Sequence, residues 1–331
     1  MLLEVEDLTQ RFEVSGGVLD RLAFSHGRIL SPRRVVHAVN GVSFALDRGE
    51  VLGIVGESGC GKSTVAKTIA RIYRPTGGAI RIEGENISAF GYREMLPIRR
   101  KVQMIFQDPF ASLNPRQRVK DIVVDPMRQT GMGAREREEK ALALLERVGL
   151  NAEQAHRYPH QFSGGQRQRI GIARALSVEP QLVIADEPVS ALDVSIQAQI
   201  LNLMMDLRDE FGLAYLFISH NLSVVRHISD RIGVMYLGFM VELAPREALF
   251  EDARHPYTRA LLASAPALDA PEGEAAELVG EVPSAYVLPS GCPFRTRCPH
   301  AVERCAAERP ALREIAPGHT VACHLVEEGV L

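Results

Sequence analysis

A run of residues near position 60 has the types and spacing to bind phosphate groups. It follows the pattern G-x-x-x-x-G-K-[ST] and is Gly56-Glu57-Ser58-Gly59-Cys60-Gly61-Lys62-Ser63, with Thr64 next. The glycines allow successive backbone N–H groups to curl around phosphate oxygens, and a helix after the loop adds its positive N-terminus. In such a loop Lys62 reaches the β- and γ-phosphates, and the Ser63 hydroxyl is a ligand of Mg²⁺. The alternative is a glycine-rich turn that matches by chance.

A pair of acids ends an apolar run further along the chain, Leu182-Val183-Ile184-Ala185-Asp186-Glu187. At the end of a strand, Asp186 suits the surroundings of a bound Mg²⁺, and Glu187 can polarise a water molecule for in-line attack on a γ-phosphate. Positioning and charge neutralisation dominate phosphoryl transfer, and a general base adds roughly 10²–10⁴-fold. The alternative is a solvated turn. Together with the loop, the pair predicts nucleotide hydrolysis.

A second anion-binding geometry follows from Ser163-Gly164-Gly165-Gln166, which precedes a predicted helix to about Ser177. One nucleotide rarely needs two phosphate-binding helix starts from the same chain. The pattern therefore predicts that two chains share each nucleotide across a dimer.

The elements that must position these residues alternate between strand and helix. Short apolar runs at 51–55, 182–185 and 214–219 predict buried strands, and residues 194–211 predict a helix with one apolar face, capped by Asp193. This order is typical of a parallel α/β sheet. Strands are also expected at 1–12, 35–39 and 42–46, and a helix from the phosphate loop to about Tyr73.

Three stretches differ from this pattern. Residues 90–165 are charged and lack strong strand signals, which predicts an inserted helical lobe with its clearest helix at 134–148. Residues 245–290 are rich in Pro, Ala and Glu and are expected to connect the core to a small cysteine-bearing module at 291–331.

With these motifs in their order and spacing, the sequence closely resembles the ATP-binding subunit of ABC transporters over about residues 1–245. Further positions match the family: Gln107 its Q-loop glutamine, Ser190–Asp193 its D-loop, and His220 its switch histidine. Asn221 stands where an aspartate often follows that histidine. The resemblance implies a P-loop α/β fold of the ABC ATPase type with an antiparallel β subdomain, an inserted helical subdomain (about 90–165) and a C-terminal extension (246–331).

The resemblance also implies roles for individual residues. The catalytic groups are Glu187, His220, Gln107 and Lys62, and Mg²⁺ is bound near Ser63, Gln107 and Asp186. Phe12 is expected to stack on adenine, although a packing role is the alternative. The other residues expected to contact ATP are Gly56, Ser58, Gly59, Cys60, Gly61, Lys62, Ser63, Thr64, Gln107, Asp186, Ser163, Gly164, Gly165 and Gln166.

Two features resemble one subfamily, the ATPase subunits of dipeptide/oligopeptide importers: the run His255–Leu262 and the cysteine tail. The extended loop at 13–36 and Asn114-Pro115-Arg116 resemble the second of the two ATPase subunits in those systems. Arg28, Arg33 and Arg34 of the loop could approach anionic lipid headgroups, or the loop is simply solvated.

The tail contains Cys292, Cys298, Cys305 and Cys323. Structural zinc sites usually show cysteine pairs two to four residues apart, so this wider spacing fits zinc poorly. Thiolates on a compact loop also suit an iron–sulfur cluster, and free or oxidised thiols are the third possibility. The subfamily resemblance implies a 4Fe–4S cluster with a structural role.

Composition narrows the remaining classes. The 331 residues carry 38 Lys and Arg against 41 Asp and Glu, for a net charge of −3, which argues against a general nucleic-acid binder. We find no apolar run long enough to span a membrane and no basic leader, which predicts a cytoplasmic location. A soluble ABC ATPase acting on nucleic acid or ribosomes would need a second core or a long coiled coil, and an iron–sulfur redox protein would leave the other motifs without purpose.

The resemblance implies a defined set of partners. These are a sister ABC ATPase in a heterodimer, two transmembrane permeases and an external solute-binding protein, at the cytoplasmic face of the inner membrane. ATP would be held between one subunit's phosphate loop and the other subunit's equivalent of Ser163–Gln166.

Overall fold

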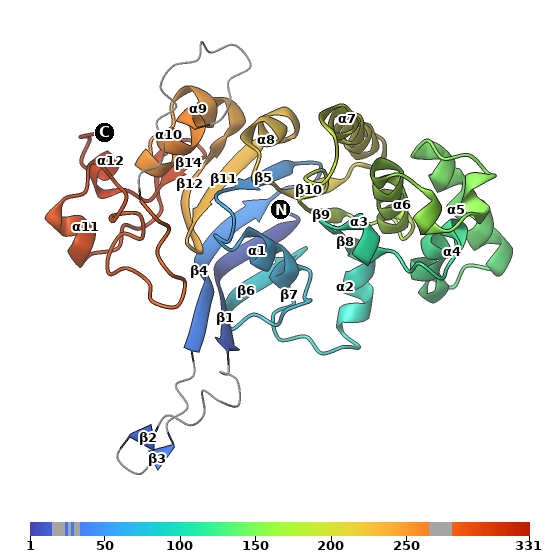
Figure 1. The fold of residues 1–331 in the computed structure, drawn as a ribbon, viewed down its shortest axis with the longest axis horizontal. Coiled ribbons are helices and arrows are strands. Elements are labelled where there is room, and N and C mark those ends of the chain that lie inside the picture. Colours follow the sequence, from blue (N-terminus) through green and yellow to red (C-terminus); the bar gives the residue numbers. More distant parts are fainter. Residues whose placement is uncertain (15–23, 26–27, 30–33, 265–279) are drawn as a thin grey trace. The chain divides into compact units, whose positions relative to one another are not determined.

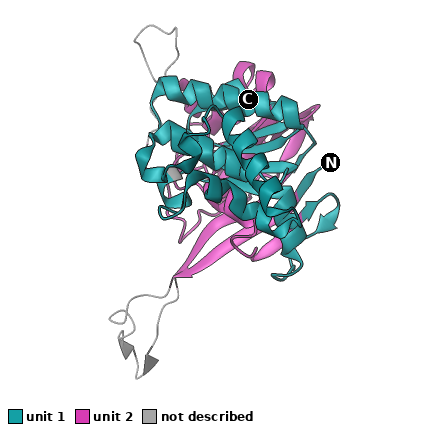
Figure 2. Cartoon of the chain, turned by 90° about the vertical axis from the view of Figure 1, so that its right-hand side faces the viewer, with its two compact units in different colours: residues 1–4, 45–54, 81–230 teal, residues 5–44, 55–80, 231–331 magenta. Residues whose placement is uncertain are grey.

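The computed structural model describes residues 1–14, 24–25, 28–29, 34–264 and 280–331. The chain divides into two compact units, each made from several stretches of sequence (Figure 2). Unit 1 comprises residues 1–4, 45–54 and 81–230, and unit 2 comprises residues 5–44, 55–80 and 231–331.

Unit 1 is built on four parallel strands in the order β5-β10-β9-β8 (Figure 1). These strands are β5 (Val51–Val55), β8 (Val102–Ile105), β9 (Leu182–Asp186) and β10 (Ala214–Ile218). Every residue of β5, β9 and β10 is buried, as expected for central strands of a parallel sheet. In register, Ile218 pairs with Asp186, so the carboxyl ends of β9 and β10 are level.

The helices of unit 1 fall into two groups along the chain. The first belongs to the inserted segment: α2 (Met95–Lys101), α3 (Pro109–Ser112), α4 (Val119–Val124), α5 (Ala134–Arg147) and the 3₁₀ turns η2 (Asp125–Gln129), η3 (Gln154–His156) and η4 (Pro159–Gln161). The second group connects the strands: α6 (Gly164–Leu176), α7 (Val194–Phe211) and α8 (Leu222–Ile228).

Unit 2 contains two groups of strands. In one, β4 (Arg34–Leu46), β1 (Leu3–Val14) and β6 (Gly77–Ile82) are neighbours in that order. The last two residues of β6 belong to unit 1 and pair antiparallel with β7 (Glu85–Asn86) of the same unit. In the other, β12 (Phe239–Pro245) lies between β11 (Arg231–Tyr236) and β14 (His319–Val321), and β13 (Arg313–Ala316) follows β14. Two short strands, β2 (Phe24–Ser25) and β3 (Arg28–Ile29), form a separate antiparallel pair.

The helices of unit 2 are α1 (Lys62–Ile69), α9 (Arg246–Glu251), α10 (Pro256–Ala263), α11 (Glu303–Ala307) and α12 (His324–Glu327). The C-terminal segment contains strands β13 and β14 and helices α11 and α12. Its strand β14 pairs with β12 through Val321–Glu242 and Thr320–Leu243, which ties the module to the rest of the unit.

Several sequence predictions need correction. The stretch 90–165 has no strong strand signal and is expected to be a helical lobe, but β8 lies inside it and pairs with β9. Asp193 precedes α7 as predicted, but its side chain makes no capping hydrogen bond. The expected strands 35–39 and 42–46 form one strand, β4, and the helix after the phosphate loop ends at Ile69 rather than near Tyr73. The stretch 245–290, predicted as a connector, contains α9 and α10.

The extended loop predicted at 13–36 is shorter at both ends, since β1 reaches Val14 and β4 begins at Arg34. Arg34 is exposed, whereas Arg33 and the side chain of Arg28 lie outside the described residues. Across the described ranges, none of the helices combines the length and the apolar character needed to cross a bilayer.

Candidate functional site

The phosphate loop occupies the turn before α1 in unit 2. Gly61 is the N-cap of α1 with a φ of +104°, and a Cβ there would lie 2.2 Å from the Ala38 carbonyl oxygen, so only glycine fits. The Lys62 side chain is buried and its Nζ donates to the carbonyl oxygens of Gly56 (2.7 Å) and Glu57 (2.9 Å). The loop therefore closes around its own lysine at the start of a helix, where the N-terminus favours anions.

Cys60 is buried beneath this loop. Its Sγ lies 3.7 Å from Lys62 Nζ. Burial raises the pKa of the Cys60 thiol despite the nearby lysine, so the thiol is neutral at physiological pH. In this loop Cys60 is a small, buried packing residue.

A second group of predicted residues meets at the carboxyl ends of three adjacent strands in unit 1. Gln107 follows β8, Glu187 follows β9 and His220 follows β10. Gln107 Nε2 donates to Glu187 Oε2 at 2.9 Å, and His220 Nδ1 lies 3.2 Å from the same oxygen. Parallel strands commonly present ligand-binding groups at this edge. The structure thus brings together residues that are up to 113 positions apart in the chain.

The backbone of Glu187 is strained, with a φ of +47°. Its N–H donates to the Ile218 carbonyl oxygen at 2.9 Å, and its own carbonyl oxygen accepts from Ser190 Oγ at 3.1 Å. These bonds hold the residue in place against the strain. Only 13% of the Glu187 side chain is exposed, against 53% for His220, so the carboxylate is sheltered while the imidazole remains accessible.

The expected Mg²⁺ ligands are all oxygen donors of the kind that hard cations prefer: the Ser63 hydroxyl, the Gln107 amide and the Asp186 carboxylate. Asp186 is the last residue of β9 and is almost fully buried. The donor chemistry therefore fits Mg²⁺ bound together with phosphate oxygens. Such a shared site differs from a metal site made of protein side chains alone. In the described part of the chain, no three His, Cys, Asp or Glu side chains are grouped as ligands of one metal ion.

The second predicted anion site is the N-terminus of α6. Ser163 is the N-cap: its Oγ accepts from the Gln166 N–H at 3.4 Å, and Gln166 Oε1 accepts from the Ser163 N–H at 3.1 Å. A Cβ on Gly165 would lie 2.4 Å from Ile196 Cγ2, so glycine allows α6 to approach α7 closely. Ser163, Gly164 and Gln166 are all accessible to a ligand, being exposed or half-buried.

Phe12 lies in β1 and packs edge-on against Tyr73, with ring centroids 5.1 Å apart. Phe12 is half-buried, so part of the side chain stays accessible. The packing role considered in the sequence analysis is therefore present. Stacking on adenine stays a prediction.

Asn221 has a local structural role. Its Oδ1 accepts from the backbone N–H groups of Ser223 (2.9 Å) and Val224 (3.4 Å), which caps α8. Asn and Asp are equally good at this position. The departure from the family's aspartate therefore keeps the cap while removing a charge beside His220.

The four C-terminal cysteines line one small cavity, together with His255, His300 and His324. The cavity measures about 10 Å³, room for the centre of a single water molecule. Burial raises the pKa of Cys292 to about 11, and it also raises the pKa values of Cys298 and Cys323. The donor set suits iron–sulfur chemistry, but a cluster would require the thiols to ionise. In the described part of the chain these cysteines are not arranged as ligands of one metal ion.

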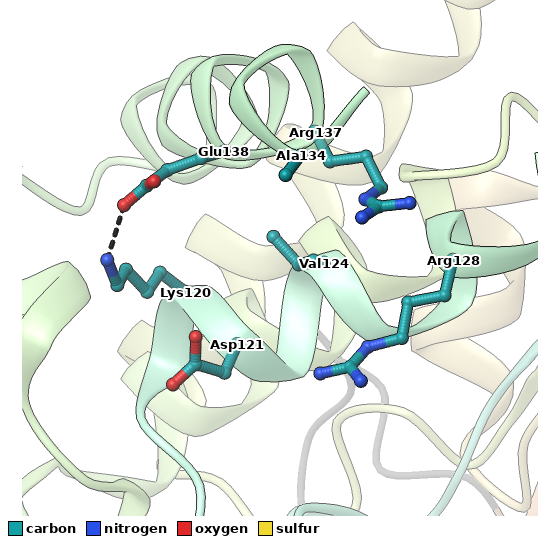
Figure 3. A pocket seen from close by; sticks show the side chains of 7 residues that line it. All are labelled: Lys120, Asp121, Val124, Arg128, Ala134, Arg137 and Glu138. Carbon is teal, nitrogen blue, oxygen red and sulfur yellow. Dashed lines mark hydrogen bonds and ion pairs between the residues drawn. The ribbon is translucent and has the colours of Figure 1, made fainter. Parts of the chain in front are cut away.

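A hollow of about 440 Å³ lies between α4 and α5 in unit 1 (Figure 3). Its lining mixes basic and acidic side chains, and Lys120 pairs with Glu138 across it. The other lining residues are Asp121, Val124, Arg128, Ala134 and Arg137. None of the predicted site residues lies in it, so it is not the nucleotide site.

Two contacts of the phosphate loop were not predicted from the sequence. The Glu57 N–H donates to Tyr257 Oη at 3.0 Å, and the Glu57 carboxylate pairs with Arg297. Both partners come from the C-terminal part of unit 2, at least 200 residues further along the chain. No local pattern could have signalled them.

Comparison with known proteins identifies relatives along the whole chain. The family model described as ABC transporter matches residues 39–190, and the model described as oligopeptide/dipeptide transporter, C-terminal region, matches residues 241–305. The chain is 53% identical over 329 residues to the oligopeptide transport ATP-binding protein AppF of Bacillus subtilis (strain 168), covering 98% of this chain and 97% of that protein. It is 47% identical over 329 residues to the di/tripeptide transport ATP-binding protein DppF of Pseudomonas aeruginosa (strain UCBPP-PA14), covering 99% and 98%.

Solved structures of ABC ATP-binding proteins share the fold of this chain. A dimeric post-hydrolysis state of the ATP-binding cassette MJ0796, bound to ADP and Pi, superposes with a TM-score of 0.63 at 27% identity, over 74% of this chain and 99% of that one. The cbiO1 protein of Clostridium perfringens, part of the ABC transporter complex cbiONQ, gives a TM-score of 0.63 at 25% identity, over 76% and 91%.

Proposed function

This chain belongs to the ABC transporter ATP-binding proteins of the oligopeptide/dipeptide transport family, and we propose that it hydrolyses ATP to power import of dipeptides, oligopeptides or related small solutes. The resemblance inferred from the motifs is thereby confirmed. It includes the likeness to the second of the two ATPase subunits of such importers, to which AppF and DppF correspond. The fold is the P-loop α/β fold of ABC ATPases with an antiparallel β subdomain. The division into residues 1–245 and 246–331 stays a prediction.

The observation that best supports hydrolysis is the convergence of Gln107, Glu187 and His220 at one strand edge. We propose that the Glu187 carboxylate polarises the attacking water while His220 and Gln107 orient it toward the γ-phosphate. The phosphate loop with Lys62 holds the triphosphate, Ser63 and Asp186 with Gln107 hold Mg²⁺, and Phe12 stacks on adenine. Mg²⁺ supplies charge neutralisation on the phosphates.

Dimer formation follows from the separate anion site at the start of α6. In our proposal, residues Ser163–Gln166 contact the ATP held by a sister ATPase, and the sister's equivalent residues contact the ATP held here. Closing of this dimer drives two permeases that dock near Gln107 and the helical subdomain, and an external solute-binding protein delivers the cargo. The assembly lies at the cytoplasmic face of the inner membrane. AppF and DppF are both named as ATP-binding proteins of peptide transport, which favours transport over a switch on nucleic acid or ribosomes.

The mechanism is tested by comparing Glu187→Gln with Lys62→Ala. Glu187→Gln keeps the hydrogen bond from Gln107 available but loses the charge that polarises water, so ATP binding should persist, turnover should fall by at least 10²-fold and a closed dimer should accumulate. Lys62→Ala should instead lose nucleotide affinity. ATP binding, phosphate release and size-exclusion chromatography with ATP measure these outcomes. Near-normal hydrolysis by Glu187→Gln would show that the base lies elsewhere.

For the cysteine tail we propose a structural 4Fe–4S cluster held by Cys292, Cys298, Cys305 and Cys323, with zinc as the less favoured ligand. The proposal is supported by the single cavity that all four share. Protein purified without oxygen should absorb near 400 nm and contain iron and sulfide. Stoichiometric zinc without iron would overturn the assignment.

A further inference from the structure

One charged side chain of the C-terminal module reaches the phosphate loop. Arg297 Nη1 donates to Glu57 Oε2 at 2.7 Å, and Arg297 Nη2 donates to Glu57 Oε1 at 3.1 Å. This two-point pairing matches the planar guanidinium to the carboxylate. The Arg297 side chain is only 4% exposed and that of Glu57 only 25%, so the pair is sheltered from water. Glu57 in turn raises the pKa of Arg297, which stays charged at any physiological pH.

An aromatic cluster surrounds this pair. The Arg297 guanidinium lies 5.8 Å from the ring centroid of Tyr236, which contacts the rings of Tyr257 (4.8 Å) and Phe294 (5.2 Å). All three rings are buried. Tyr257 also accepts the Glu57 N–H, so both the backbone and the side chain of Glu57 are held from the C-terminal part of the unit. Three hydrogen bonds therefore define the position of Glu57 relative to the C-terminal part of the unit.

Glu57 occupies a sensitive place in the loop. Its carbonyl oxygen accepts from Lys62 Nζ, so the position of Glu57 affects where the catalytic lysine lies. Its carboxylate is a negative charge in a loop that must receive a triphosphate. Like charges a few ångströms apart repel strongly where water is partly excluded. An unpaired Glu57 carboxylate would therefore oppose ATP binding, and Arg297 removes this penalty.

We propose that Arg297 is a positioning residue for ATP binding: by pairing with Glu57 it neutralises the phosphate loop and fixes its shape, so that the C-terminal module determines ATP affinity in part. The inference rests on the proposed function, since it concerns the same nucleotide. It also gives the extension a task within the ATPase cycle. Arg297 directly precedes Cys298, so one segment both lines the cysteine cavity and supports the loop.

The test is a set of variants titrated with Mg·ATP by calorimetry, on the purified full-length chain. Arg297→Gln should weaken ATP binding about tenfold, a size typical of coupling between linked sites. The turnover number at saturating ATP should change less than twofold, because Arg297 acts on binding and not on the water-activating residues. The loss should shrink at high salt, since its cause is electrostatic.

The second variant removes the repelling charge. The double variant Glu57→Gln with Arg297→Gln should recover ATP affinity to within about twofold of the original protein, because replacing both members of an ion pair by neutral groups restores the balance. Arg313→Gln is the matched control. Arg313 also pairs with a glutamate of the C-terminal module, Glu327, but this glutamate lies outside the phosphate loop, so the removal of Arg313 should leave ATP affinity unchanged.

Three results would overturn the inference. Arg297→Gln could bind ATP as well as the original protein. The double variant could remain as weak as Arg297→Gln, which would mean that Arg297 acts through packing alone. Arg297→Lys keeps the charge and replaces Arg297→Gln if that variant does not fold. We expect it to lose ATP affinity at most about threefold, and a tenfold loss would be the third contradicting result. Failure of the unchanged protein to bind Mg·ATP would instead contradict the proposed function.

Discussion

At the scale of single residues, the central feature is the Glu187 carboxylate. One of its oxygens meets both Gln107 and His220, and its backbone adopts a left-handed conformation that costs about 1–3 kcal/mol. Surrounding hydrogen bonds from Ser190 and to Ile218 offset that cost. A strained residue held by several bonds at a strand end is typical of a site where precise placement matters more than stability.

The sequence predicts such residues well when their motif is local. The phosphate loop, the acid pair and the start of α6 each depend on spacing within a few residues, and the structure has a helix N-terminus at both predicted anion sites. By contrast, the pairing of Glu57 with Arg297 joins positions 240 residues apart and depends on how the C-terminal module packs. No periodicity or local motif encodes that contact.

At the scale of elements, helices and strands are predicted accurately where the sequence shows a continuous apolar run or a sustained apolar face. A short strand without such a run is missed. Strand β5 and helix α7 have the predicted bounds. Strand β5 is a continuous apolar run, and α7 has a sustained apolar face. Strand β8 was missed because it has four residues, lies between charged segments and includes the polar Gln103. Its burial comes from pairing with β9, which is a tertiary effect.

The stability of helix α10 is expected to depend on pH. Its N-cap is His255, whose Nδ1 accepts from the Tyr257 N–H at 3.1 Å. Burial lowers the pKa of His255 from 6.5 to about 4, so the imidazole is neutral at pH 7 and can accept. Since the unfolded chain binds a proton at higher pH than the folded chain, His255 makes stability fall as pH drops from about 6.5 to about 4.

We therefore expect protonation of His255 to lower the free energy of unfolding of unit 2 by up to about 3 kcal/mol between pH 6.5 and pH 4. This figure is the pKa shift of His255 multiplied by about 1.4 kcal/mol per pKa unit. His255→Asn keeps a capping acceptor but does not titrate, so it should flatten the fall in melting temperature between pH 7 and pH 5. His227→Asn, at an exposed histidine of α8, is the control and should keep the original slope. An unchanged slope in His255→Asn would contradict the assignment.

Glu242, a neighbour of His255, titrates in a separate window. Burial alone would raise the pKa of its carboxyl group, but hydrogen bonds from His319, Thr258 and the Arg254 N–H outweigh burial and lower the pKa. Its stabilising contribution is present above the unfolded value near 4.5 and is lost as pH falls through the lower folded value. The pH range proposed for His255 therefore lies mainly above the range of Glu242.

At the scale of the whole molecule, the C-terminal segment is joined to the ATPase part by three kinds of contact within unit 2. Strand β14 pairs with β12, the His319 imidazole contacts the buried Glu242 carboxylate at 2.8 Å, and Arg297 pairs with Glu57. The extension is therefore integrated with strand β12 and with the phosphate loop. Composition and cysteine spacing predicted a separate module, but only the folded chain shows these connections.

Whether this chain powers a membrane importer is tested by affinity purification of the tagged chain from detergent-solubilised membranes, with its companions identified by mass spectrometry. We expect to recover a second ABC ATPase together with two multi-span permeases, and a solute-binding protein found with them would narrow the cargo. Recovery of soluble partners alone, such as ribosomal or repair proteins, would contradict the transport function while leaving the ATPase chemistry intact.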